Sequence, residues 1–124
     1  MKLKNIEVDF SFTNADDVER LELAIKKVKE KSEEYKRQEM NLSDAIRKEC
    51  KVIDDFFDTV FGEGIAQKLF EGKMDLEEHA ELFIEIANEK VRQTKGMQEI
   101  YNNLENKSKY MPNREQRRYN KFKR

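Results

Sequence analysis

Apolar and polar residues alternate near the start of the chain. Ile6, Val8, Phe10 and Phe12 are apolar, and the residues between them are polar. A period of two is typical of a β-strand with one buried face. The pattern predicts one strand, or two short strands in a hairpin around Lys4–Asn5. An isolated hairpin is marginally stable in water, so we expect this segment to pack on helices or to pair with another chain.

A long helix is predicted from about residue 14 to about residue 40. Thr13 or Asn14 is suited to cap it, and Asp16 and Asp17 favour the positive end of the helix dipole. Its apolar positions recur at alternating spacings of three and four residues, which indicates a narrow seam. The seam comprises Val18, Leu21, Ile25, Val28, Ser32 and Tyr35. We expect it to pack within the chain or to form a coiled coil with a partner.

A second helix is predicted after a cap at Asn41 or Ser43, ending at Gly62 in the left-handed conformation. Its apolar face is broader and richer in aromatic residues than the first seam, so we expect it to form the centre of the core. The face comprises Ala45, Ile46, Cys50, Val52, Ile53, Phe56, Phe57, Val60 and Phe61.

A short helix through Ile65, Leu69 and Phe70 is predicted next, with a stop at Gly72. Asp75 is suited to cap a third long helix, although Gly96 weakens its interior by about 1 kcal/mol. The apolar residues of this helix are Leu76, Ala80, Leu82, Phe83, Ile84, Ile86, Ala87 and Val91, followed past Gly96 by Met97, Ile100, Tyr101 and Leu104. Pro112 breaks any helix beyond this point.

These elements predict a mainly α fold. It has three long helices plus a short one, a short N-terminal β-strand or hairpin, and a basic C-terminal tail. The composition agrees, because charged residues make up 41% and hydrophobic residues 37% of the chain. Helices bury one stripe and leave the rest in water, which suits such a balance.

Charge divides the chain into two parts. Residues 107–124 hold eight basic residues and one acidic residue, a net charge of +7, whereas residues 1–106 carry a net charge of −8. We therefore expect an acidic helical domain over residues 1–106 and a basic, flexible tail over residues 107–124.

No arrangement of residues predicts catalysis, a metal site or a cofactor. His79 is the only histidine, and we expect it at the surface or at the boundary of the core. Asp54 and Asp58 lie one turn apart, and we interpret them as a solvated rim. Cys50 reads as a small core residue, since no histidine or helix N-terminus nearby would activate its thiol. The sequence indicates a protein that binds other macromolecules.

The tail combines basic and aromatic side chains. Arg114, Arg117 and Arg118 would share one side of a helix over residues 113–124, and Tyr110, Tyr119 and Phe122 are interleaved with the basic residues of the tail. Three interpretations remain open: a solubilising terminus, docking on an acidic protein surface, and, less favoured, binding of nucleic acid.

Three parts of the chain resemble one family of proteins. They are residues 6–10 with 14–20, residues 61–64 leading to 68–72, and residues 110–118. In these segments the chain is similar to small proteins encoded in the tail modules of phages and prophages of Gram-positive bacteria, where a tail assembly chaperone is expected. The resemblance implies a helical adaptor that binds the tape-measure protein or the tail-tube subunits, without enzymatic activity or a cofactor.

We therefore expect a phage tail assembly chaperone in the cytoplasm of the host cell. The alternatives are a structural component of the virion tail and a nucleic-acid-associated protein that uses the basic tail. Self-association into a homo-oligomer is a further expectation, and no segment is apolar enough to predict a membrane partner. The predicted partner-binding residues are Leu21, Ile25, Val28, Phe83, Ala87, Arg114, Arg117 and Arg118.

Overall fold

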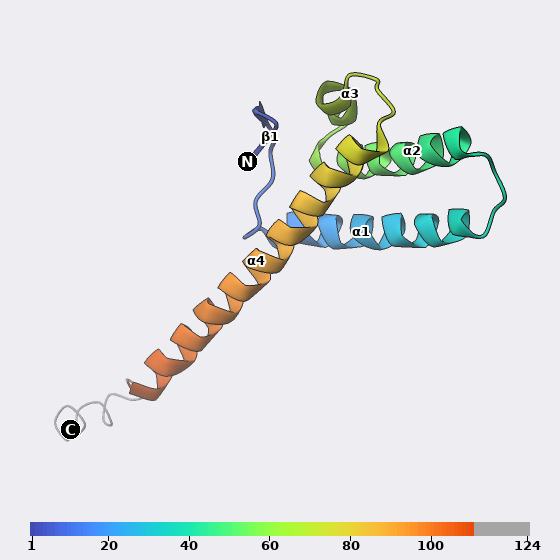
Figure 1. The fold of residues 1–124 in the computed structure, drawn as a ribbon. Helices are drawn as coiled ribbons and strands as arrows, with labels where there is room; N and C mark the ends of the chain where they lie inside the picture. Colours follow the sequence, from blue (N-terminus) through green and yellow to red (C-terminus); the bar gives the residue numbers. More distant parts are fainter. Residues whose placement is uncertain (111–124) are drawn as a thin grey trace. The chain divides into compact units, whose positions relative to one another are not determined.

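Four helices follow a short hairpin in the computed structural model, which describes residues 1–110 (Figure 1). The predicted mainly α fold is thus confirmed. The chain divides into two compact units, one over Met1–Asn88 and one that begins at Glu89. The charge boundary predicted between residues 106 and 107 is a separate division and stays a prediction.

The N-terminal segment forms the hairpin rather than a single strand. Strands β1 (Lys2–Leu3) and β2 (Ile6–Glu7) pair antiparallel, with Leu3 opposite Ile6. Lys4 and Asn5 between them have φ angles of 50° and 70°. Positive φ at both central residues is the requirement of a type I′ turn, whose twist matches that of the flanking strands.

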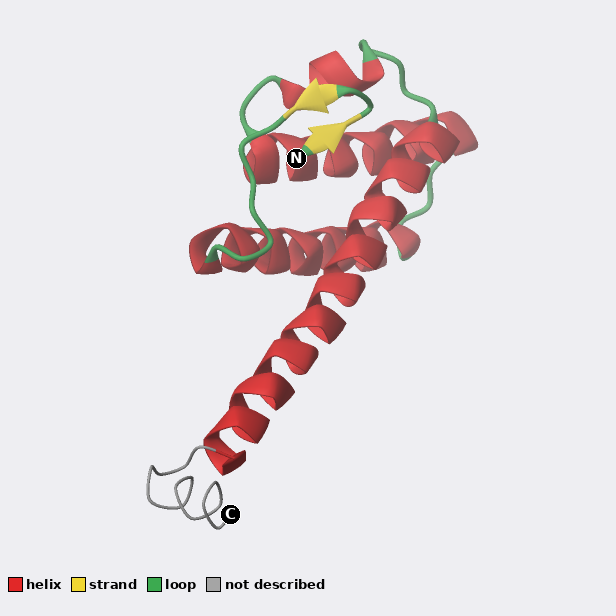
Figure 2. Cartoon of the chain, turned by 90° about the vertical axis from the view of Figure 1, so that its left-hand side faces the viewer, coloured by secondary structure: helices red, strands yellow, loops and turns green. Residues whose placement is uncertain are grey.

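The first two helices lie side by side and antiparallel (Figures 1 and 2). Helix α1 spans Ala15–Lys36 and helix α2 spans Leu42–Phe61. Both begin as predicted. The side chain of Asn14 accepts a hydrogen bond from the backbone N–H of Asp17, and that of Asn41 accepts one from the N–H of Asp44.

Aromatic residues of α2 form the centre of the core, as predicted. Phe57 has no exposed surface, and its ring contacts those of Phe56, Phe61 and Phe70 at centroid distances of 5.0–5.8 Å. The elements that pack around this face contribute Leu3, Val8, Phe10, Leu21, Ala24, Val28, Ile65, Leu69, Leu82 and Ile86.

Helix α3 (Ile65–Phe70) depends on α2 for its start. It has no side-chain cap of its own at Gly64, and the Asp58 carboxylate accepts a hydrogen bond of 2.8 Å from the N–H of Ala66. Gly62 ends α2 with φ 125° and ψ 143°, so the left-handed conformation predicted there is wrong. Its positive φ still favours glycine.

Helix α4 (Leu76–Tyr110) is continuous through Gly96. Asp75 caps it as predicted, since its carboxylate accepts a hydrogen bond from the N–H of Glu78. The backbone of residues 107–110 belongs to this helix, and the rest of the predicted tail lies outside the described residues.

The core assignment predicts the effect of shortening its central ring. We expect Phe57→Ala to lower the free energy of unfolding by about 3–5 kcal/mol, because a buried ring is replaced by a cavity. The matched control is Leu23→Ala on α1, where the side chain is exposed, and we expect a change within about 0.5 kcal/mol. Chemical denaturation followed by circular dichroism measures both, and equal losses would refute the assignment.

Candidate interaction surfaces

Helix α4 carries an exposed apolar stripe in the second unit. The stripe consists of Met97, Ile100, Tyr101 and Leu104, whose exposed fractions are 59%, 51%, 65% and 61%. The spacing i, i+3, i+4, i+7 places four such residues on one face of a helix. Such a face is typical of a helix that packs against another helix.

The same spacing occurs where α4 is buried. In the first unit, His79, Leu82, Phe83 and Ile86 stand at i, i+3, i+4 and i+7, and they pack into the core. The stripe therefore repeats the pattern of a covered helix face in a segment whose side chains are exposed.

Local hydrogen bonds support the second unit of α4. The Glu89 carboxylate accepts hydrogen bonds from Gln93 and Arg92, which lower its pKa. The Thr94 hydroxyl donates to the carbonyl oxygen of Lys90 at 2.9 Å. These contacts lie within one helix and each contributes little, so packing against a partner would add most of the stability of this segment.

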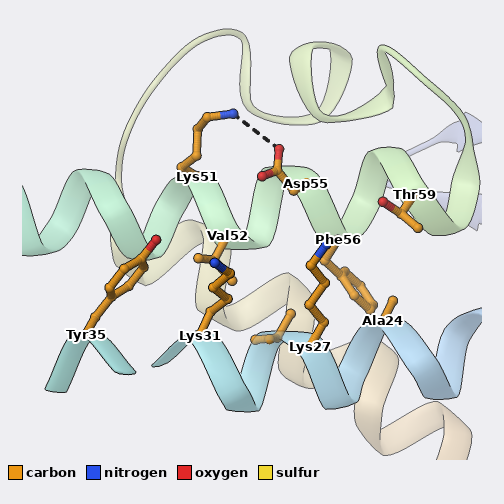
Figure 3. Close-up of a pocket in the computed structure, with 10 residues that line it drawn as sticks. Ala24, Lys27, Lys31, Tyr35, Lys51, Val52, Asp55, Phe56 and Thr59 are labelled. Atoms are coloured by element: carbon orange, nitrogen blue, oxygen red, sulfur yellow. Dashed lines mark hydrogen bonds and ion pairs between the residues drawn. The ribbon is translucent and has the colours of Figure 1, made fainter. Parts of the chain in front are cut away.

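A second candidate surface is a hollow of about 290 Å³ between α1 and α2 (Figure 3). Val28, Val52 and Phe56 form part of its lining, and lysine side chains stand around it. One of them, Lys51, pairs with Asp55 at 3.3 Å. The hollow thus combines an apolar floor with a charged rim.

His79 is fully buried, so the prediction of a surface or boundary histidine is wrong. Its ring stacks on Phe70 with centroids 3.7 Å apart. Its Nδ1 lies 2.8 Å from the carbonyl oxygen of Asp75, and its Nε2 lies 2.8 Å from a carboxylate oxygen of Asp54. A carbonyl oxygen can only accept, so Nδ1 carries a proton and donates it.

The predicted solvated rim of Asp54 and Asp58 is also wrong, because both carboxylates have partners inside the fold. Asp58 caps α3, and Asp54 bonds His79. Burial raises the pKa of Asp54, and the attraction of His79 only partly offsets this effect. The Asp58 contact joins α2 to α3, and the Asp54 contact joins α2 to α4, so both carboxylates have a structural role.

The buried histidine was missed because a single sequence does not show which polar residue has a partner in the core.

Lys4 lies beside the cluster formed by Asp54, Phe70 and His79. Its Nζ donates to the carbonyl oxygen of Leu69 at 3.0 Å, pairs with Glu78 at 2.9 Å, and lies 5.0 Å from the centre of the Phe70 ring. These contacts of Lys4 link the hairpin to α3 and α4.

Cys50 and the acidic residues provide no metal site in the described part of the chain. No group of three or more His, Cys, Asp or Glu residues there could hold a metal ion. Cys50 is buried, and desolvation, followed by the charges of Asp54, Asp75 and Glu49, raises the pKa of its thiol to about 11. This agrees with its interpretation as a core residue.

The predicted partner-binding residues divide into three groups. Leu21 and Val28 are buried, and Ile25 is partly buried against the same core, so these side chains are covered within the chain. The reason is that the seam of α1 is used within the chain, against α2. Val28 still reaches the floor of the hollow.

Phe83 packs against Phe56 with centroids 4.9 Å apart, and Ala87 is half-buried. Phe83 thus belongs mainly to the core. Arg114, Arg117 and Arg118 lie outside the described residues. The sequence shows the helical spacing of the α4 stripe, but it does not show that these side chains are exposed.

The chain belongs to a family described as "Family of unknown function (DUF6673)", whose model matches residues 4–121. No curated protein and no solved structure matched the chain. The family description names no activity, so the resemblance to phage tail-module proteins stays a prediction. Among the described residues, no helix is both long and apolar enough to cross a membrane.

The Asp54–His79 contact predicts a difference between two substitutions. Asp54→Leu removes the partner of the buried Nε2, and we expect the free energy of unfolding to fall by about 1–3 kcal/mol. Asp54→Asn keeps an amide N–H that can donate to an unprotonated Nε2, so we expect a smaller loss. Asp55→Leu, at an exposed neighbouring position, is the control in urea denaturation.

The raised pKa of Asp54 adds a pH dependence to this test. A carboxyl group with a raised pKa stabilises the folded chain fully below its unfolded value of 3.8. This contribution is lost as the pH rises through the folded pKa. The Asp54→Asn variant lacks the titration, so its stability relative to the parent chain should rise with pH across this window. A difference that does not change with pH would contradict the assignment.

Proposed function

We propose that this protein is a non-enzymatic assembly chaperone or adaptor of a phage tail, which binds the tape-measure protein or the tail-tube subunits in the host cytoplasm. The exposed stripe of α4 carries the proposal. It offers an apolar helix face to a helical partner, and the resemblance of the sequence to tail-module proteins implies a partner of this kind.

The composition around the stripe supports a role in binding. Residues 97–104 contain one charged residue, Glu99, in a chain that is 41% charged. The remaining residues between the apolar positions are Gln98, Asn102 and Asn103. Depletion of charge at the centre of a patch is typical of protein interfaces.

The size of the stripe suits binding that can be reversed. Full burial of one large apolar side chain contributes about 1.5–3 kcal/mol, and these residues still have 51–65% of their surface exposed, so only that part can be gained on binding. The cost of association offsets much of the sum. Four such residues therefore favour a moderate affinity, which allows a chaperone to leave when the tube subunits take its place.

The proposal predicts that charge on the stripe abolishes binding. The chain is expressed with its tail-module proteins and captured by an affinity tag. We expect Ile100→Asp with Leu104→Asp to reduce recovery of tape-measure or tail-tube protein at least about tenfold, because carboxylates would have to enter an apolar contact.

The matched control is Asn102→Asp with Asn106→Asp, which adds the same charge at the same spacing on the opposite side of the helix, where both residues are exposed, and should leave recovery unchanged. Circular dichroism checks that both variants keep their helix content. Capture of neither partner by the parent chain would refute the proposal. Mass spectrometry of purified particles tests the alternative, since a stoichiometric amount in the finished tail would make the protein a structural component.

A further inference from the structure

The hollow between α1 and α2 differs in charge from the rest of the domain. Lys27, Lys31 and Lys51 line it, with Asp55 as its one acidic lining residue, so its lining carries a net charge of +2. Residues 1–106 together carry a net charge of −8. A basic site on an acidic body attracts acidic partners and repels basic ones.

Two of these lysines are weakly neutralised. Lys51 pairs with Asp55, and Lys31 lies 3.8 Å from a carboxylate oxygen of Glu34, which is a long contact on the solvent side. Lys27 forms no ion pair within the described part of the chain. Figure 3 shows Lys27 and Lys31 rising from α1 beside the hollow, opposite Asp55 on α2.

The floor of the hollow is apolar. Val28, Val52 and Phe56 form it, and the ring of Tyr35 closes one end. The Nζ of Lys48 lies 5.2 Å from the centre of that ring, which adds another positive charge beside the site. A volume of about 290 Å³ is at the lower limit of small-molecule sites, which run from roughly 300 to 1,000 Å³. It suits one or two side chains better than a cofactor.

We infer that this hollow docks an acidic peptide segment, taking an apolar side chain onto the floor while the carboxylates on either side of it pair with Lys27 and Lys31. The chemistry favours a peptide over nucleic acid. The apolar floor can hold an aliphatic or aromatic side chain of a peptide, and it offers nothing to a sugar–phosphate backbone. The hollow shares no residue with the stripe of α4, so this inference does not rest on the proposed function.

A designed peptide tests the inference. The probe is a fluorescein-labelled helical peptide of Glu, Ala and Leu with Leu at every third or fourth position, and fluorescence anisotropy measures its binding to the full chain. We expect Lys27→Glu with Lys31→Glu to weaken binding at least about tenfold, because two attractions become repulsions. Lys26→Glu with Lys29→Glu, on the opposite side of α1, changes the net charge equally and should have little effect.

Thr59→Trp provides a second variant that leaves the charge unchanged. Thr59 is exposed and lines the hollow, so a larger side chain there should fill the site without disturbing the core, and binding should weaken. Replacing every Leu of the peptide by Ala should weaken it as well. Equal losses in the two lysine pairs, or equal affinity for the Leu-free peptide, would overturn the inference. Displacement of the peptide by an equal concentration of oligothymidylate would also overturn it, since the hollow would then bind polyanions in general.

Discussion

The first unit depends on a single apolar face, that of α2. A chain with so many charged residues has little apolar surface to distribute, and within residues 1–110 most of the phenylalanine rings stand on this helix or pack against it. Phe56, Phe57 and Phe61 contact one another and give the hairpin, α1, α3 and α4 a common surface. The narrow apolar seam of α1 packs against the apolar face of α2. This contact covers the seam of α1 and part of the face of α2 at the same time.

Polar contacts then fix the orientation of the packed elements, which the apolar face alone does not determine. An aromatic surface tolerates rotation and sliding of its neighbours, whereas a hydrogen bond requires a defined direction. Asp54 orients α4 through His79, Ser32 on α1 donates to Glu49 on α2, and Lys4 holds the hairpin to α3 and α4. The single histidine thus serves as a spacer between two helices, stacked on Phe70.

Helix positions and caps could be predicted from the sequence because they depend on local chemistry. Asn14, Asn41 and Asp75 act within a few residues of the helices that they begin. The two-residue period was less informative, because it covers residues 6–12 and only Ile6–Glu7 of these residues forms a strand. The exposure of individual residues could not be predicted, because it depends on which apolar helix faces pack against each other in the fold. Leu21 and Met97 stand in similar helical patterns, yet one is buried and the other exposed. His79 illustrates the same limit, since its partner Asp54 is distant in sequence.

The dependence of α3 on its neighbours has a consequence for how the molecule opens. This helix is too short to persist alone, its first free N–H group is bonded by Asp58 of α2, and its last carbonyl groups include the acceptor of Lys4. It therefore has no independent local stability. Opening of this helix to expose the amide hydrogens of Leu69 and Phe70 would break the contacts of Asp58 and Lys4 at the same time, so exchange at this short segment reports on how the elements of the first unit open together.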